Sequence, residues 1–239
     1  MKEMVKNLIT STNDILENVF GIRIIRRRGI ALGISRFIDW KQLDRLPAID
    51  TLIDVGVGPD GTPDLYERFA SQKLILIDPL DEAEAFVNNE MTDRDAMFFK
   101  VALGSETSEL VINVEEDFGR STLLEVTDIN YVSEPIDKRI VPVRKLDDLL
   151  SNQVGLGRVG IKIDTEGFEL DVVLGATETL RSAKFVIAEV RHNHESFKGG
   201  YSLHEFVNAM HENGFVLSMI MTAKPLIADL CFEPKAELG

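Results

Sequence analysis

A strand, glycine turn, helix and strand over residues 51–78 constrain this chain more than any other feature. The apolar run 51–53 leads into the turn DVGVGPDG at 54–61, and a second apolar run, 74–77, ends on Asp78. Glycines let a backbone approach a ligand closely, and an acid after the second strand can accept hydrogen bonds from both hydroxyls of a ribose. The pattern therefore predicts half of a nucleoside-binding site in an α/β fold.

Apolar runs alternate with helix-period segments along the chain, which is typical of a parallel sheet covered by helices on both faces. The expected strands are 51–56, 73–78, 96–102, 158–164, 184–190, 214–222 and 226–232. The expected helices are 62–71, which starts with Thr62 as its N-cap, and 81–90, 168–174 and 202–213.

The last two expected strands are joined by the short connection 223–225, so they must pair antiparallel. The predicted fold is α/β and Rossmann-like, with a mostly parallel seven-stranded sheet that ends in an antiparallel hairpin. This is the layout of class I S-adenosylmethionine-dependent methyltransferases, and it is not the usual layout of dinucleotide dehydrogenases.

Charge and pattern divide the chain into parts. Residues 1–46 carry nine Lys and Arg against five Asp and Glu, whereas the whole chain has a formal charge of −14. We expect a basic, amphipathic N-terminal extension over 1–46 and one catalytic domain over 47–239. Within that domain, 105–145 departs from simple alternation, with extended segments at 109–114 and 139–143. This segment is expected to be an insertion that covers part of the cleft.

The overall acidity argues against nucleic acid as the main partner. The only cysteine, Cys231, excludes an internal disulfide and suits a reducing cytosol. No run is long enough for a membrane span, and the N-terminus lacks the apolar core of a signal peptide. We therefore expect a cytoplasmic location. The segment 21–40 either packs its apolar residues on the domain or contacts the inner membrane face, and the oligomeric state stays open.

The glycine turn alone does not identify the cofactor, because Gly56, Gly58 and Gly61 fit a pattern that NAD and FAD sites share. Asp54 discriminates better, since a carboxylate there would repel a pyrophosphate and attract the ammonium of a methionine tail. Two alternatives stay open. One is an NAD-dependent sugar oxidoreductase or epimerase, although the Tyr-x-x-x-Lys pair common in such enzymes is absent from the sequence. The other is a non-catalytic binding module.

An acidic cluster follows the expected strand 158–164. Asp164 ends this strand and should face the cleft, because ligands bind at the carboxyl ends of strands in open α/β sheets. Glu166 either caps the next helix or belongs to the site, and Glu169 is expected to be solvated. Asp164 is therefore the first candidate for a proton acceptor or a metal ligand.

A second polar group follows the strand 184–190. Glu189, His192 and His194 lie where a reactive group would be useful, and a histidine titrates near neutral pH. His192 is the stronger histidine candidate as proton acceptor. Alternatively, Asp164, Glu189 and a histidine hold a divalent metal that lowers the pKa of a substrate hydroxyl.

Three blocks together resemble the FkbM family of methyltransferases. They are IDVGVGPDG at 53–61, VRKLDDLL at 143–150, and IKIDTEGFE at 161–169 with its continuation to 176. The last block is the most specific, and the resemblance covers roughly residues 47–233. The chain departs from the family pattern at Asp78, where many members have Glu before the proline, and at 57–60, where members often have Ala-Asn.

The resemblance implies a Rossmann-like fold, S-adenosylmethionine as donor and methylation of an oxygen. Family acceptors include sugar hydroxyls of glycans and hydroxyls of polyketide-type products, so the expected substrate is a sugar hydroxyl of a glycan or glycan precursor. By position, the resemblance places Asp54, Gly56 and Gly58 at the methionine portion, Asp78 at the ribose, and Val101, Ala102 and Ser121 near the adenine. Asp60, Gly61 and Pro79 belong to the same two turns and complete the expected cofactor site.

Overall fold

The computed structural model describes residues 23–26, 32–35, 40–127, 135–191, 196–223 and 226–237. The chain divides into two compact units, 1–41 and 42–239. In the first unit, strands β1 (Arg23–Arg26) and β2 (Leu32–Ser35) pair antiparallel. The two interpretations of the segment 21–40 rest largely on residues outside the described ones. Among the described residues, no helix combines the length and apolarity needed to cross a bilayer.

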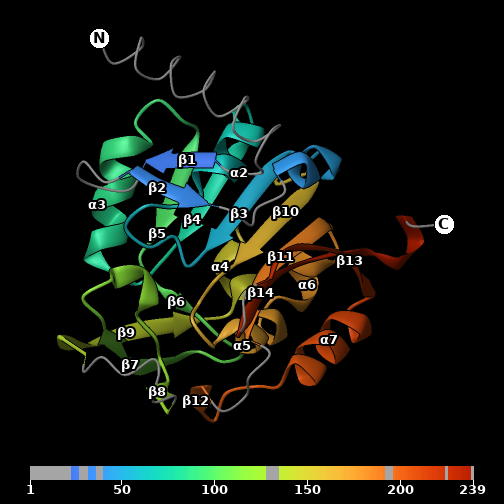
Figure 1. Ribbon diagram of the computed structural model, residues 1–239. Helices are drawn as coiled ribbons and strands as arrows, with labels where there is room; N and C mark the ends of the chain where they lie inside the picture. The colour runs from blue at the N-terminus through green and yellow to red at the C-terminus, as the bar shows by residue number, and fades with distance from the viewer. Residues whose placement is uncertain are drawn as a thin grey trace, which may run out of the picture. The chain divides into compact units, whose positions relative to one another are not determined.

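The second unit is built on a seven-stranded sheet with the order β13-β14-β11-β10-β3-β4-β5 (Figure 1). Its strands are β3 (Thr51–Val55), β4 (Lys73–Ile77), β5 (Ala96–Phe99), β10 (Val159–Ile163), β11 (Ala183–Arg191), β13 (Phe215–Ala223) and β14 (Ile227–Pro234). The pairs from β5 through β11 are parallel, whereas β14 is antiparallel to both β11 and β13. The predicted sheet with its terminal hairpin is confirmed.

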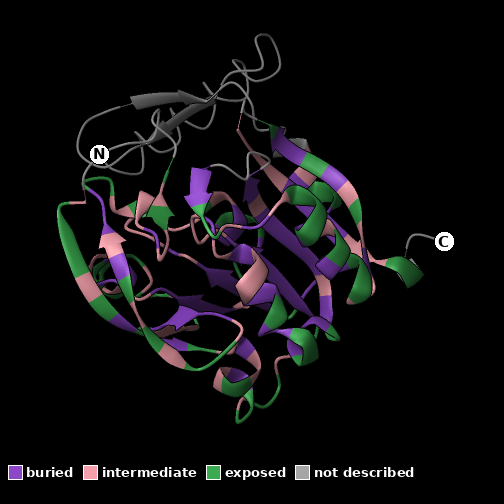
Figure 2. Ribbon diagram, turned by 90° about the horizontal axis from the view of Figure 1, so that it is seen from below, coloured by how far each residue is buried: buried purple, intermediate pink, exposed green. Residues whose placement is uncertain are grey.

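Both faces of this sheet are covered, which explains the near-continuous apolar runs of its central strands. Ile53 of β3 belongs to a core cluster with Val172 and Phe206, which come from helices on one face. On the opposite face, Phe69 stacks on Phe185 of β11 with ring centroids 5.7 Å apart. Buried residues therefore follow the central strands, and exposed ones gather on the outer sides of the helices (Figure 2).

The helices of the second unit are short. They are α2 (Pro63–Arg68), α3 (Asp81–Glu90), α4 (Leu146–Leu150), α5 (Glu169–Leu174), α6 (Thr177–Leu180) and α7 (Leu203–Glu212), with 3-10 turns η2 (Phe118–Arg120) and η4 (Lys235–Glu237). A further 3-10 turn, η1 (Trp40–Arg45), includes the boundary between the two units. The four expected helices are present. The sequence reading missed α4 and α6, because so few residues do not establish a helical period.

The helix starts differ in how well the sequence predicted them. At α7, Ser202 and Glu205 form a reciprocal capping box, which the sequence reading did not predict. At α2, Thr62 stands at the N-cap position but makes no capping hydrogen bond. Its hydroxyl donates to Asp54 Oδ2 at 2.9 Å instead. The predicted N-cap position of Thr62 and the proline that follows it are confirmed, but the Thr62 hydroxyl binds the buried carboxylate instead of the helix end.

The departure from alternation at 105–145 corresponds to a second sheet with the order β6-β9-β7. Strands β7 (Ser108–Val114) and β9 (Asp137–Arg144) pair antiparallel and contain the expected extended segments. The strand expected at 96–102 is divided, since β5 ends at Phe99 and β6 (Ala102–Leu103) pairs with β9. A short pair, β8 (Glu125–Val126) and β12 (Phe197–Lys198), lies nearby, and all these strands lie beyond the arrowheads of the parallel strands (Figure 1).

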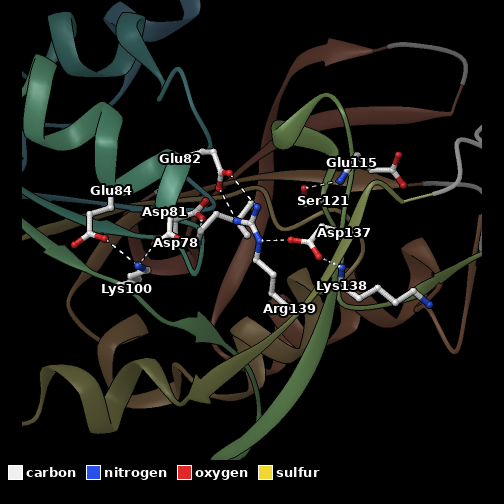
Figure 3. A network of polar contacts seen from close by, with 11 residues as sticks. Asp78, Asp81, Glu82, Glu84, Lys100, Glu115, Ser121, Asp137, Lys138 and Arg139 are labelled. Atoms are coloured by element: carbon white, nitrogen blue, oxygen red, sulfur yellow. Dashed lines mark hydrogen bonds and ion pairs between the residues drawn. The ribbon is translucent and has the colours of Figure 1, made fainter.

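An ion pair ties this second sheet to the central domain (Figure 3). Arg139 on β9 donates to both carboxylate oxygens of Glu82 in α3, over 2.8 and 3.1 Å, and its Nε donates to Asp137 at 2.9 Å. The hydrogen bonds from Arg139 lower the pKa of Glu82. The bidentate geometry fixes the orientation of β9 against α3.

A double-mutant cycle with Arg139→Ala and Glu82→Ala should give a coupling of about 1 kcal/mol in the free energy of unfolding, measured in urea. This coupling energy lies at the upper end of the range for surface ion pairs, because the side chains of Arg139 and Glu82 are only 29% and 22% exposed. The pair Lys198–Glu125 is the control, since its side chains are 70% and 68% exposed and should show almost no coupling. Equal couplings in the two cycles would contradict the structural role of Arg139.

Candidate active site

A cavity of about 540 Å³, partly open to solvent, lies at the carboxyl ends of β3, β4 and β10. This is the expected ligand position in an open α/β sheet. Its lining includes seven residues expected to bind the cofactor: Gly56, Gly58, Asp78, Pro79, Val101, Ala102 and Ser121.

Gly56 is the most constrained position of the glycine turn. Its φ is +81°, and a Cβ there would lie 1.7 Å from the main-chain carbonyl oxygen of Asp164. The amide of Asp164 in turn donates to the carbonyl of Val55 at 2.9 Å. The turn after β3 and the turn after β10 are thus in direct backbone contact, which only a glycine at position 56 permits.

The far end of the turn does not line the cavity. Gly61 has a φ of +60°, and a Cβ there would lie 2.6 Å from the rings of Tyr66 and Phe86. Its small size therefore serves the packing of α2 and α3. Asp60 is exposed and is also absent from the cavity lining. Direct cofactor contacts from Asp60 and Gly61, which the sequence reading expected, find no support in this geometry.

Asp78, which the sequence reading assigned to the ribose, lines the cavity. Its Oδ2 accepts a hydrogen bond from the amide of Gly58 at 2.9 Å, and its Oδ1 accepts one from the amide of Leu80 at 2.8 Å. A carboxylate offers about four acceptor positions, so two remain for the hydroxyls of a ribose. Burial raises the pKa of Asp78 to about 6.

This pKa predicts a pH dependence of ligand binding. With a pKa of about 6, the Asp78 carboxylate is mostly ionised at pH 7 and can then accept hydrogen bonds from hydroxyls of a ligand, whereas its protonated form loses acceptor capacity. The affinity for S-adenosylhomocysteine should therefore fall as the pH drops from 7 to 5, by up to about tenfold per pH unit. Calorimetric titration across this range provides the measurement. Asp78→Asn should bind weakly with a shallower pH dependence, and a flat wild-type profile would remove Asp78 from the ribose site.

Asp54 does not occupy the position that the sequence reading gave it. Its side chain is fully buried and does not line the cavity. Oδ2 accepts hydrogen bonds from Thr62 and from Tyr66, the latter at 2.5 Å. Burial raises the pKa of Asp54. The carboxylate therefore anchors α2 behind the glycine turn, and a direct contact with an ammonium group is not supported, because α2 encloses it.

Asp164, by contrast, lines the cavity, and its side chain is 29% exposed. Carboxylate oxygens of Asp164, Glu166 and Glu189 all lie within 4.8 Å of one another. This spacing suits proton transfer, and oxygen ligands so close together could also hold a divalent cation. His192 and His194 lie outside the described residues, so their contribution stays a prediction.

Glu166 has an unusual backbone and an unusual partner. Its φ is +51°, the one positive value at a non-glycine residue in the described part of the chain. Its carboxylate pairs with the guanidinium of Arg191. Burial raises the pKa of Glu166 to about 7, with the nearby Asp164 acting in the same direction and Arg191 opposing both. Glu166 can therefore exchange a proton near neutral pH, and it does not cap α5, whose N-cap residue is Phe168.

Glu169 was expected to be solvated, and this expectation is wrong. Its side chain is buried, and it accepts hydrogen bonds from the amides of Thr165 and Gly167 at 2.9 and 3.0 Å. The hydroxyl of Tyr201 donates to the same carboxylate at 2.6 Å. Glu169 thus holds the turn that carries Glu166, a role that depends on Tyr201, which is distant in the sequence.

Several cavity residues were missed by the sequence reading. Phe118 and Leu123 come from the segment 105–145, and Phe168 comes from the turn before α5. These apolar side chains can pack against a flat, apolar group such as an adenine ring. Lys162 was also missed as a functional residue, although a lysine in a buried parallel strand is an informative signal, because lysines are almost never buried without a partner.

Comparisons with known proteins agree with this geometry. A family model described as the methyltransferase FkbM domain matches residues 54–217. The crystal structure of methyltransferase FkbM from Methylobacillus flagellatus KT superposes with a TM-score of 0.52 at 15% sequence identity, covering 77% of this chain and 43% of that chain. This likeness shows the fold, and the present chain spans less than half of the length of that protein.

Two further solved structures are more distant. Ribosomal protein L11 methylase from Lactobacillus delbrueckii subsp. bulgaricus has a TM-score of 0.44 at 17% identity and covers 90% of this chain and 85% of its own. Magnesium protoporphyrin IX methyltransferase from Synechocystis PCC 6803, with bound S-adenosylmethionine, has a TM-score of 0.43 at 12% identity, with coverages of 95% and 96%. No curated protein sequence matches this chain.

Proposed function

Because the chain belongs to the FkbM family of S-adenosylmethionine-dependent methyltransferases, we propose that it methylates the oxygen of a sugar hydroxyl in a glycan or glycan precursor. The family assigns S-adenosylmethionine as the methyl donor. It gives no support to the alternative of an NAD-dependent oxidoreductase. The acceptor class is inferred from the family resemblance and from the chemistry of the cavity.

The cavity fits the donor. At Gly56 and Gly58 no side chain separates the backbone from a ligand. Asp78 retains free acceptor positions, and apolar side chains such as Phe118 and Phe168 form the rest of the lining. When bound, S-adenosylmethionine supplies a methyl group on a positively charged sulfur. We assign Asp78 to the ribose and the glycine turn to the methionine portion, with Val101, Ala102 and Ser121 beside the adenine.

The carboxylate of Asp164 carries the proposal of oxygen methylation. A sugar hydroxyl is a weak nucleophile until its proton is removed, and a positioned carboxylate can accept that proton. Asp164 lines the cavity and its Oδ2 accepts a hydrogen bond from Lys162 at 3.0 Å. Glu189, close to Asp164, is the supporting candidate. The protein has to align the hydroxyl with the donor and to keep Asp164 within reach of the hydroxyl proton.

The test is an acceptor screen with S-adenosylmethionine that carries a ¹³C-labelled methyl group. Neutral glycosides, amino sugars and nucleotide sugars are offered, and the product is examined by NMR. The proposal expects a methyl signal on a sugar oxygen. A methyl on nitrogen or carbon would overturn oxygen methylation, and donor binding without transfer to any acceptor would favour a non-catalytic module.

The same assay separates the two roles left open for the carboxylates. If Asp164, Glu166 and Glu189 hold a divalent cation, exhaustive chelation abolishes transfer and added Mg²⁺ restores it. Transfer that is unchanged after chelation assigns the acid–base role to the side chains alone. Glu189→Gln adds a second test. If Glu189 is a metal ligand or a proton acceptor, this substitution should lower turnover more than it lowers the affinity for the donor.

A further inference from the structure

Lys162 occupies a buried position between the two motifs of the site. It lies on β10 opposite Asp54 of β3, and it is 8% exposed. Its Nζ donates to Asp164 Oδ2 at 3.0 Å and lies 3.8 Å from Asp54 Oδ1. One ammonium therefore serves two carboxylates, one behind the glycine turn and one in the cavity.

The second contact matters because Asp54 Oδ1 is buried and accepts no hydrogen bond from the described residues. The other oxygen of Asp54 is already held by Thr62 and Tyr66. An uncompensated carboxylate oxygen in such a place is costly, and the nearby ammonium is what offsets that cost. Lys162 is thus the counter-ion of Asp54 as well as of Asp164.

The titration of Lys162 agrees with this geometry. Burial by itself lowers the pKa of a lysine, but the carboxylates of Asp164 and Asp54 outweigh burial and raise the pKa of Lys162. Asp229 on β14, two strands away in the sheet, acts in the same direction. The two carboxylates therefore favour the charged form of Lys162.

We propose that Lys162 is a positioning residue that balances the charges of Asp54 and Asp164 and holds Asp164 so that it presents a carboxylate oxygen to the cavity. The inference rests on the proposed role of Asp164 near the transferred methyl group. Without the lysine, the carboxylates of Asp54 and Asp164 would lose the cation that lies within 4 Å of both, and carboxylates close to each other can share a proton. With the ammonium in place, no proton has to be shared between the two carboxylates. The carboxylate of Asp164 therefore remains able to accept a proton from the substrate.

The test uses donor binding alone, so that it does not depend on which acceptor the enzyme takes. Calorimetry of S-adenosylmethionine binding at pH 8, in buffers of different ionisation enthalpy, counts the protons released on binding. At this pH, Asp78 and Glu166, with pKa values of about 6 and about 7, are mostly ionised. In Lys162→Met, the positively charged donor should displace the shared proton, with a release of about one proton per site.

Four comparisons complete the experiment. The wild type and Lys162→Arg should release almost no protons when they bind S-adenosylmethionine. Lys162→Met should also release almost none when it binds S-adenosylhomocysteine, whose thioether sulfur is uncharged. Lys198→Met removes an exposed, ion-paired lysine and should behave as the wild type. A merely structural role predicts that Lys162→Met weakens both ligands equally without proton release, and this result would overturn the proposal.

A variant that does not fold still leaves a test. If Lys162→Met is unfolded, the double variant Lys162→Met/Asp54→Asn removes the second carboxylate together with the lysine. The proposal requires that this variant recover a cooperative thermal transition and bind S-adenosylmethionine without proton release. An unfolded double variant would contradict the charge-balancing role. A failure of oxygen methylation in the acceptor screen would leave these binding results unaffected.

Discussion

Gly56→Ala is expected to eliminate measurable binding of S-adenosylmethionine and to destabilise the fold. The added Cβ would lie 1.7 Å from the carbonyl oxygen of Asp164, so the two backbone turns would have to separate. The backbone at φ +81° adds a conformational cost of roughly 1–2 kcal/mol for a residue with a side chain. Together with the backbone clash, we expect a loss of about 4 kcal/mol in the free energy of unfolding.

Gly155→Ala is the matched control for this prediction. Gly155 has a similar φ of +76°, but a Cβ there would meet nothing within 4 Å. It therefore reports the conformational cost alone, about 1–2 kcal/mol, with unchanged ligand affinity. Chemical denaturation and calorimetry with S-adenosylhomocysteine measure both quantities. If Gly56→Ala behaves like Gly155→Ala, the contact between the turns does not shape the site.

Asp164→Asn is expected to lower turnover by roughly 10²–10⁴-fold while the affinity for S-adenosylhomocysteine changes by only a few-fold. The amide keeps the shape of the carboxylate but cannot accept the proton of a hydroxyl. The ammonium of Lys162 also loses the negative charge of its partner at 3.0 Å, so a modest loss of stability should accompany the change. The measurement combines steady-state kinetics on the acceptor found in the screen with calorimetric binding.

Glu178→Gln provides the control for charge removal, since Glu178 is an exposed carboxylate paired with Arg181 on α6. It should leave both turnover and binding unchanged. The decisive result is whether Asp164→Asn lowers turnover far more than it lowers the affinity for the donor. A variant that binds the donor normally and still transfers the methyl group at the wild-type rate would exclude Asp164 as the proton acceptor.

The sequence alone was sufficient for the seven-stranded sheet with its terminal hairpin and for several residues of the cavity lining. Apolar runs of the right length predicted the strands, and the short connection 223–225 required the terminal hairpin. The glycines at 56 and 58 and the acid at 78 were identifiable because backbone conformation and strand ends are local properties. These residues line the cavity in the structure.

The tertiary structure alone decided what the charged side chains do. From the sequence, Asp54 was expected to face a ligand and Glu169 to face solvent. In the structure both carboxylates are buried and hydrogen-bonded. Their partners, Tyr66 and Tyr201, come from other elements, and Lys162 meets Asp54 only because β3 and β10 are adjacent in the sheet. A periodic pattern records which face a residue takes, whereas the partner of a buried charge is set by which distant segments the fold brings together.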